Sequence, residues 1–206
     1  MSELQEIALA SDVVIVDSGG ANLASLTFAF ERLGVQARIS REPKIIAAAS
    51  HVVLPGVGTA ANAMQRLESA GLTAAIRELT QPVLGICLGM QLLFQTSEEG
   101  PTECLGLLPD TVRRMHSAPG RPVPHMGWNQ VKCERDDPLL EGIGADDYAY
   151  FVHSYAAAVS PVTVAHTEYG KRFSAVVRRD NFCGAQFHPE RSGKTGARVL
   201  ENFLRL

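Results

Sequence analysis

The sequence predicts an α/β fold built on a mixed, mostly parallel central sheet. Short runs of β-branched and aliphatic residues alternate with segments of helical periodicity through the first half of the chain, which is typical of a parallel sheet with crossover helices. Glycine-rich turns follow several of these runs. The second half is rich in alternating polar and apolar residues, which predicts half-buried antiparallel strands.

The first predicted strand is the β-branched run Val13–Val16, and Asp17 begins the turn after it. Asn22 is placed to cap a helix over residues 23–33, in which leucine and phenylalanine side chains recur at helical spacing. Gly34 is then predicted to end this helix in a left-handed conformation. The turn after Asp17 lacks the G-x-G-x-x-G pattern of a dinucleotide-binding loop, and the chain contains no Walker motif.

The next elements continue the alternation of strands and helices. We expect a strand over residues 35–39, a short helix over 43–49, a strand over 51–54 and a helix that starts near Thr59. Residues 55–58 form a glycine-rich loop at the end of their strand, and ligand crevices in such sheets lie at the carboxyl ends of the strands. Glycines there allow the backbone to approach a ligand and to aim N–H groups at it.

Residues 85–89, G-I-C-L-G, have the pattern of a nucleophile elbow, in which a reactive side chain sits on a tight turn between a strand and a helix. The apolar run 83–86 predicts the strand, and leucines at helical spacing from residue 88 predict the helix. The corner residue takes a strained backbone conformation, so both flanking positions must be small. A helix N-terminus favours the thiolate of Cys87. A cysteine between glycines is also compatible with a small buried apolar residue, so a catalytic role requires a base elsewhere in the chain.

Residues 101–127 contain five prolines and little periodicity, so we predict loops and short strands there, including a strand over 112–115. Further strands are predicted at residues 130–133, 148–153, 162–166, 173–178 and 182–187. A short helix is expected to begin at Leu139, and residues 194–206 predict a final helix that packs on the sheet. No repeat, low-complexity tract or linker interrupts the chain, so one domain over residues 1–206 is expected.

The composition is that of an ordinary globular protein and excludes several functional classes. The 19 basic and 22 acidic residues give a net charge of −3, so the chain lacks the basic surface expected of a nucleic-acid-binding protein. Its apolar runs are too short to cross a membrane, and residues 1–12 lack the basic and apolar regions of a signal peptide. The four cysteines are scattered without a C-x-x-C pair, which predicts no disulfide framework, no zinc site and a reducing, cytoplasmic location.

A second chemical motif, His188-Pro189-Glu190, lies near the carboxyl end of the chain. The proline ends a strand and turns the chain, so the histidine and the glutamate can point into the same space. A carboxylate beside a histidine fixes its tautomer and stabilises its cation, which suits a general base for Cys87. The H-x-E spacing also occurs in zinc deaminases, but their downstream P-C-x-x-C motif is absent here.

Three motifs in this order resemble the catalytic segments of the class I, or triad, glutamine amidotransferases. They are P-G-V-G at residues 55–58, G-I-C-L-G-M-Q at 85–91 and Q-F-H-P-E at 186–190, and the resemblance spans nearly the whole chain. It implies a three-layer, flavodoxin-like α/β fold with helices on both faces of the sheet. It also implies a triad of Cys87, His188 and Glu190 that hydrolyses the side-chain amide of glutamine through a thioester, without a metal or a cofactor.

The resemblance further implies which residues bind the substrate. Around bound glutamine it places Gly56, Val57, Gly58, Leu88, Gln91, Glu99, His153, Ser154 and Tyr155. The oxyanion is expected to be held by the Leu88 N–H and by an N–H of the 56–58 loop. Gln91, Glu99 and the backbone of residues 153–155 are expected to hold the amino acid end. The carboxylate of Glu99 suits the α-ammonium group, because a desolvated cation needs a counter-charge.

Four further motifs resemble, within that class, the glutaminase subunits of imidazole glycerol phosphate synthase. They are D-x-G-x-x-N-L from Asp17, H-M-G-W-N from His125, Y-F-V-H-S-Y from Tyr150 and H-P-E-R-S from His188. The implied partner is a (β/α)8-barrel cyclase subunit in a heterodimer, which uses the ammonia to make imidazole glycerol phosphate and an aminoimidazole carboxamide ribotide in histidine biosynthesis. The chain departs from the pattern at Ser18, where an aromatic residue is usual, and at Arg191, where lysine is usual.

The sequence leaves three other functions open. Another amidotransferase of the same class would feed anthranilate, purine or pyridoxal phosphate synthesis, and the subunit that co-purifies would distinguish it. A free-standing thiol peptidase of the same fold would hydrolyse γ-glutamyl peptides without a partner. A regulatory binding module would have a vestigial site, which titration of Cys87 with an alkylating reagent would reveal.

Overall fold

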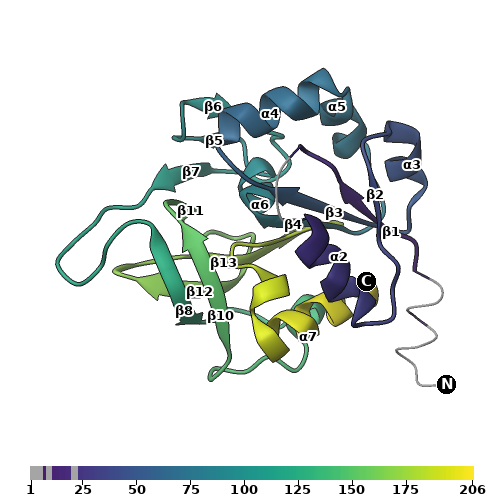
Figure 1. The fold of residues 1–206 in the computed structure, drawn as a ribbon. Coiled ribbons are helices and arrows are strands. Elements are labelled where there is room, and N and C mark those ends of the chain that lie inside the picture. The colour runs from purple at the N-terminus through teal and green to yellow at the C-terminus, as the bar shows by residue number, and fades with distance from the viewer. Residues whose placement is uncertain (1–6, 8–10, 20–22) are drawn as a thin grey trace.

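The computed structural model describes residue 7, residues 11–19 and residues 23–206, which fold into an α/β structure with small sheets beside a large one (Figure 1). The predicted cap Asn22 lies outside the described residues, as do most of the N-terminal residues considered as a signal peptide. Within the described part of the chain, no helix is long and apolar enough to cross a membrane.

Eight strands form the central sheet. From one edge to the other they are β2 (Arg38–Ser40), β1 (Val13–Val16), β3 (His51–Gly56), β4 (Val83–Cys87), β14 (Phe182–Ala185), β13 (Lys171–Arg179), β12 (Thr163–Tyr169) and β9 (Lys132–Cys133). The strand pairs from β2 to β14 are parallel, and those from β14 to β9 are antiparallel. The prediction of a mixed, mostly parallel sheet is therefore confirmed.

Helices cover both faces of this sheet, which gives three layers. One face carries α2 (Leu23–Glu31) and α7 (Gly193–Leu204), and the other carries α3 (Pro43–Ala48), α4 (Ala60–Ser69), α5 (Leu72–Arg77) and α6 (Leu88–Leu92). In Figure 1, α4 and α5 lie above the strands, and α2 and α7 lie below them. The hydrophobic core has two parts, one on each face of the sheet. The pleat of β1 contributes to both, because Val13 and Ile15 pack towards α2 and α7 whereas Val14 and Val16 pack towards the opposite face.

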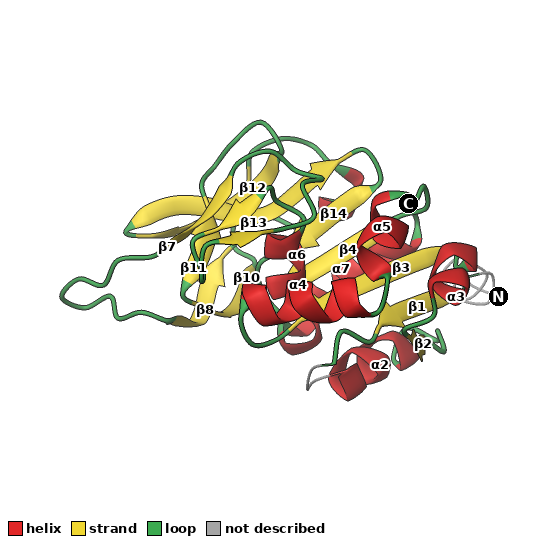
Figure 2. Ribbon diagram, turned by 90° about the horizontal axis from the view of Figure 1, so that it is seen from above, coloured by secondary structure: helices red, strands yellow, loops and turns green. Residues whose placement is uncertain are grey.

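Two smaller sheets flank the antiparallel half. β8 (His125–Gln130) pairs with β10 (Tyr148–His153). The other sheet has the order β11-β7-β5-β6 and consists of β11 (Tyr155–Ala157), β7 (Thr111–Arg114), β5 (Thr96–Ser97) and β6 (Thr102–Glu103). Two 3₁₀ turns are η1 (Pro138–Leu140) and η2 (Pro189–Arg191). The loop between β7 and β8 projects from the body of the molecule in both ribbon views (Figure 1, Figure 2).

The end of α2 shows one correct and one wrong prediction. Gly34 has a φ of 83°, its N–H donates to the Glu31 carbonyl, and the Val35 N–H donates to the Phe30 carbonyl. This pair of bonds is a Schellman motif, in which the left-handed glycine ends the helix as predicted. Because Val35 completes the motif as a buried apolar residue, the next strand begins at Arg38 instead of residue 35.

Several short elements lack a sequence signal. β8 is not predicted from the sequence, because prolines precede it and because Gly127 lies inside it with a φ of 139°. α5, β5 and β6 are two to six residues long, which is too short for a periodic pattern. The predicted strand 182–187 ends at Ala185, although the Gln186 N–H still donates to the Ala175 carbonyl of β13.

Candidate active site

Cys87 stands at the sharp corner between β4 and α6. Its backbone lies at φ 53° and ψ −112°, a conformation that is rare for a residue with a side chain. A Cβ atom on Gly89 would overlap the carbonyl oxygen of Leu54, and a Cβ atom on Gly85 would lie 2.7 Å from the carbonyl oxygen of Gly89. Close backbone contacts therefore require glycine on both sides of the corner, as expected of an elbow turn.

Gly89→Ala is expected to lower the free energy of unfolding by about 3 kcal/mol, because β3 and α6 would have to separate. Gly144→Ala is the matched control, since a Cβ atom there would meet only the Asp147 carboxylate at 3.9 Å. The control should change the free energy of unfolding by less than about 1 kcal/mol. Urea unfolding followed by circular dichroism measures both, and equal stability of the two variants would contradict the close packing of the elbow.

His188 and Glu190 follow β14, the strand next to β4. η2 begins directly after His188, and this turn places Nδ1 of His188 2.9 Å from Oε1 of Glu190. The two side chains are 13% and 1% exposed, so their contact lies mostly out of water. The His188 backbone N–H donates to the Tyr150 carbonyl, and Ser192 Oγ donates to the His188 carbonyl at 2.7 Å. These bonds fix the position of the histidine on both sides of the residue.

The His188 ring is held in its protonated form. Burial by itself disfavours the charge, but hydrogen bonds to Cys87 and Glu190, together with the charges of these two groups, raise the pKa of His188 to about 10. The fold therefore brings Cys87 next to a histidine that is far away in sequence.

Gln186 is a neighbour of the sulfur to which sequence reasoning assigns no role. Its side chain is fully buried, its Nε2 lies 3.9 Å from Cys87 Sγ, and its Oε1 accepts a bond from Gln91 Nε2 at 3.0 Å. Gln91 Nε2 also donates to the Tyr155 carbonyl at 2.8 Å, so the Gln91 amide can offer a ligand only its oxygen. The only sequence signal is the two-residue spacing from His188, which puts both side chains on one face of an extended segment.

The 56–58 loop lies directly beside the elbow. Gly56 is paired with Cys87 across β3 and β4. A Cβ atom on Gly56 would lie 2.6 Å from the Gly89 nitrogen and 2.8 Å from the Leu88 Cβ atom. The loop and the first peptide of α6 are therefore adjacent to each other and to Cys87.

Glu99 contacts the start of α4. Its Oε2 accepts a bond from the Ala60 N–H at 2.8 Å, while Thr59 Oγ1 caps the same helix by accepting from the Asn62 N–H. The carboxylate thus lies next to residues 56–58, which lead into this helix. A negative charge is stabilised at a helix N-terminus, so Glu99 has a structural contact whether or not it binds a ligand.

The side chain of His153 points into the core. Its Nδ1 lies 2.8 Å from the Tyr155 carbonyl oxygen, and its Nε2 lies 3.2 Å from Nδ1 of His125. Burial lowers the pKa of His153 to about 3 and that of His125 to about 4, so both rings are neutral at neutral pH. Only the backbone of His153 can therefore serve a ligand, as the family resemblance implies.

The backbone that leads into residues 153–155 passes close to the sulfur. The Val152 carbonyl oxygen lies 3.9 Å from Cys87 Sγ, and the Ser154 carbonyl accepts a bond from the Met115 N–H at 2.9 Å. Residues 153–155 are therefore held between β10 and the four-stranded sheet, directly after the carbonyl that lies near Cys87.

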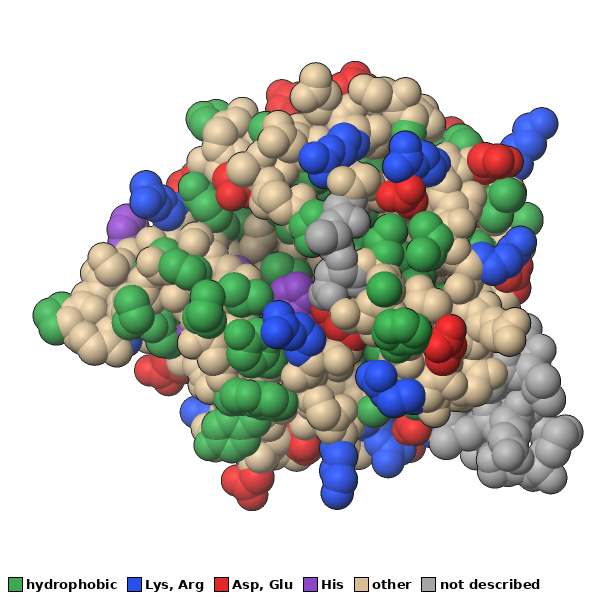
Figure 3. All heavy atoms as spheres, viewed as in Figure 1, with side chains coloured by type: hydrophobic (Ala, Val, Ile, Leu, Met, Phe, Trp, Pro, Cys, Tyr) green, Lys and Arg blue, Asp and Glu red, His purple; other side chains and the backbone are tan. Residues whose placement is uncertain are grey.

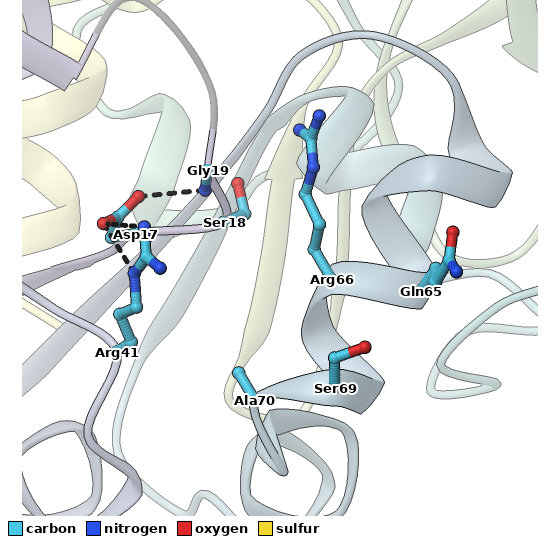
Figure 4. Close-up of a pocket in the computed structure, with 8 residues that line it drawn as sticks. All are labelled: Asp17, Ser18, Gly19, Arg41, Gln65, Arg66, Ser69 and Ala70. Atoms are coloured by element: carbon cyan, nitrogen blue, oxygen red, sulfur yellow. Dashed lines mark hydrogen bonds and ion pairs between the residues drawn. The ribbon is translucent and has the colours of Figure 1, made fainter.

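The turn after β1 borders a cavity of about 520 Å³ next to α4 (Figure 4). Burial would raise the pKa of Asp17, but the Gly19 N–H at 2.9 Å and the Arg41 guanidinium lower it. Ser18 Oγ donates to the Pro55 carbonyl at 3.2 Å, which ties this turn to β3. Ser18, which stands where the family usually has an aromatic residue, thus contacts the strand that leads into the 56–58 loop and does not contact the triad.

These groups surround one point with the components of an acyl-transfer site. A cysteine, a histidine with a carboxylate 2.9 Å away, and two backbone segments that carry N–H groups meet at the corner of the elbow. Among the described residues, no group of three or more histidine, cysteine, aspartate or glutamate side chains is arranged to hold a metal ion. All four cysteines are free thiols.

Residues 14–206 match the family model of the class I glutamine amidotransferases. Imidazole glycerol phosphate synthase subunit HisH from Xanthomonas axonopodis pv. citri (strain 306) is 56% identical over 196 residues, which cover 95% of this chain and 98% of that protein. The HisH subunit from Idiomarina loihiensis is 54% identical over 195 residues, which also cover 95% of this chain and 98% of that protein.

Solved structures share the fold at much lower sequence identity. One glutamine amidotransferase has a TM-score of 0.73 at 21% identity, with 94% of this chain and 97% of that chain covered. A putative GMP synthase protein from Thermoplasma acidophilum has a TM-score of 0.71 at 18% identity, with 95% and 92% covered. From the family match and the HisH relatives, the chain belongs to the class I glutamine amidotransferases and, within them, to the family of HisH subunits of imidazole glycerol phosphate synthase.

Proposed function

We propose that this chain is the glutaminase subunit of imidazole glycerol phosphate synthase and hydrolyses glutamine to glutamate and ammonia. The observation that carries the proposal is Cys87 on its strained turn, next to the His188–Glu190 pair. The ammonia passes to a cyclase subunit, which makes imidazole glycerol phosphate and an aminoimidazole carboxamide ribotide in histidine biosynthesis.

In the proposed mechanism, the Cys87 thiolate attacks the side-chain amide carbon of glutamine. The charge that develops on the amide oxygen is stabilised by the Leu88 N–H and by an N–H of the 56–58 loop. The His188 imidazolium gives its proton to the amide nitrogen, the C–N bond breaks, and ammonia leaves. The neutral His188 then takes a proton from water, which attacks the thioester and releases glutamate and Cys87. Glu190 orients the ring throughout both steps.

The amino acid end of glutamine is proposed to lie against Gln91, Glu99 and the backbone of residues 153–155. Hydrogen bonding supports this assignment, because Gln91 is joined to the Tyr155 carbonyl and Glu99 lies next to the 56–58 loop. The Glu99 carboxylate supplies the counter-charge for the α-ammonium group, and the fixed Gln91 oxygen supplies a hydrogen-bond acceptor.

Glu99→Gln is expected to raise the KM for glutamine about tenfold or more while changing kcat little, because a binding charge is lost and the triad is untouched. The new side chain still offers an oxygen to the Ala60 N–H, so α4 keeps its contact. Steady-state kinetics measure the effect, and alkylation of Cys87 by iodoacetamide is the control. A parallel loss of alkylation and thermal stability would show that Glu99 supports the fold instead of binding substrate.

We place the docking surface of the (β/α)8-barrel cyclase on β8, β10 and the turn after His188, in a heterodimer. Met126, Trp128 and Tyr148 are 63%, 57% and 47% exposed there, and large exposed apolar side chains that lie together mark interaction surfaces. Figure 3 shows apolar side chains gathered over these strands. Arg191 lies over the Tyr150 ring, 5.0 Å from its centroid, and connects this surface to the triad turn. A barrel docked here would lie beside the turn that carries His188 and Glu190.

The isolated chain is expected to be a poor glutaminase that the cyclase and its acceptor nucleotide activate. A peptide between Gly56 and Gly58 can rotate at little steric cost, so that either an N–H or a carbonyl faces the oxyanion. Loss of one oxyanion donor costs roughly 10²–10³ in rate, so this rotation alone gives strong activation. The test compares glutamate release by the chain alone, with the cyclase, and with the cyclase and acceptor nucleotide. An isolated chain as fast as the liganded complex would favour a free-standing amidohydrolase.

The whole chain, residues 1–206, is proposed to act as one glutamine amidotransferase domain, which the family match over residues 14–206 supports. The proposed chemistry uses a thiol, an imidazole, a carboxylate and backbone N–H groups, and it needs no cofactor. The four free cysteines support a reducing compartment such as the cytoplasm.

A further inference from the structure

A second cavity, with a volume of about 520 Å³, opens between β7, β11 and the β12–β13 hairpin. We call it the β7–β13 cavity. Its walls come from residues 113–118 at the end of β7, from residues 156–158 around the end of β11, and from residues 169–173 at the hairpin turn, with Glu98 and Arg121 beside them. None of the residues that we assign to glutamine hydrolysis lines it. The cavity is therefore a separate feature of the fold.

The rim of the β7–β13 cavity is strongly basic. Its charged and titratable side chains are Arg113, Arg114, His116, Arg121, Lys171 and Arg172, against the single acidic residue Glu98. Arg113 pairs with Glu98 at 3.0 Å, and Arg172 pairs with Glu134. In the described part of the chain, no carboxylate forms an ion pair with Arg114, Arg121 or Lys171. Three cations around one concavity are thus left without counter-charge from the protein.

The floor of the β7–β13 cavity is apolar, and its walls are held in place. Met115, Ala157 and Phe173 contribute apolar surface. Tyr169, which also lines the cavity, donates its hydroxyl to the Pro122 carbonyl at 2.9 Å and so joins the β7–β8 loop to β12.

The hairpin turn provides a second contact with the β7–β8 loop. A Cβ atom on Gly170 would overlap the guanidinium of Arg121, so glycine at this position allows the arginine to lie across the turn. The cavity is therefore shaped by specific contacts between the loop and the hairpin, and one of its unpaired cations takes part in them.

We propose that the β7–β13 cavity binds a phosphorylated small molecule with a flat apolar body, of the mononucleotide class. A volume of about 520 Å³ lies within the range of small-molecule sites. Arginine and lysine donors at the rim suit a phosphate group, which accepts several charge-assisted hydrogen bonds. The apolar floor suits a heterocyclic base, which an inorganic anion does not have. The concave shape favours a compact ligand over an extended acidic peptide.

The first test is isothermal titration calorimetry of the full chain with AMP, adenosine and inorganic phosphate. AMP is expected to bind at one site per chain and at least about tenfold more tightly than adenosine or phosphate, because only AMP uses both the rim and the floor. Its affinity should fall as the NaCl concentration rises. AMP binding no tighter than phosphate binding would reveal an ordinary basic surface and would overturn the proposal.

Matched variants then locate the site. Arg114→Gln combined with Lys171→Gln should weaken AMP binding about tenfold or more. Lys44→Gln combined with Arg205→Gln makes the same change in net charge at exposed residues outside the cavity and should leave the affinity unchanged. Ala158→Glu places a carboxylate at the cavity and should abolish AMP binding while every rim cation is kept.

Two results would contradict this location. Equal weakening by both double variants would mean that AMP responds to net charge alone. Loss of AMP binding when the chain assembles with the cyclase subunit would mean that the cavity is a partner-binding surface. AMP binding that persists in the complex and is lost only in the cavity variants would support the proposal.

Discussion

Cys87→Ala is expected to reduce glutamine hydrolysis by about 10⁴-fold or more, because the substitution removes the thiol that attacks the amide in the proposed mechanism. The fold should survive, since the bonds of the sulfur with the Val152 carbonyl and the Gln186 amide are long, at 3.9 Å each. Glutamate release at saturating glutamine measures the loss, and urea unfolding measures the stability. Glutamate release at near the original rate would refute the role of Cys87.

Two controls make this result specific. In complex with the cyclase, the Cys87→Ala variant should still support synthesis from added ammonium salts, because that chemistry belongs to the partner. Cys183→Ala removes a second buried thiol, one whose pKa burial raises to about 12, and it should leave glutaminase activity largely unchanged. A comparable loss in the Cys183 variant would indicate damage to the fold instead of loss of the nucleophile.

His188→Asn is expected to lose glutaminase activity about as completely as Cys87→Ala, because the members of a triad act as a unit. Glu190→Gln should retain roughly ten- to a hundredfold more activity than His188→Asn, because Glu190 orients the ring and does not transfer the proton. The amide still offers an oxygen to Nδ1 of His188, which the carboxylate contacts at 2.9 Å. Measurement of kcat for glutamine hydrolysis by both variants tests this order. A larger loss of kcat in Glu190→Gln than in His188→Asn would contradict the assigned roles.

The same histidine is expected to make stability depend on pH. The pKa of His188 is about 10 in the folded protein against an ordinary value of 6.5, so its stabilising contribution is fully present below pH 6.5. The contribution declines as the pH rises towards about 10, because the folded state then keeps a proton that the unfolded state has lost. The difference in unfolding free energy between the parent and His188→Asn should therefore shrink across this window. Urea unfolding at several pH values measures it, and a constant difference would contradict the raised pKa.

Elements that depend on local pattern are predictable from this sequence. Val13–Val16 forms a buried strand because β-branched side chains fill both faces of a covered sheet. Gly34 ends its helix, and Gly85 and Gly89 flank the elbow, because backbone geometry within a few residues requires glycine there. The strand after Gly34 is misplaced for the same local reason, since Val35 belongs to the end of the helix.

The sequence by itself therefore determined how strands and helices alternate along the first half of the chain. It also determined the turn that carries Cys87 and the family to which the chain belongs. Only the tertiary structure decided which distant residues surround that turn. β4 and β14 lie side by side, which brings His188 to Cys87, yet no local interaction specifies that pairing. Burial decided that the His153 ring faces the core, and long-range hydrogen bonds decided that Gln186 contacts both the sulfur and Gln91. Strand pairing and burial depend on the packing of the whole core, which a pattern within one segment does not contain.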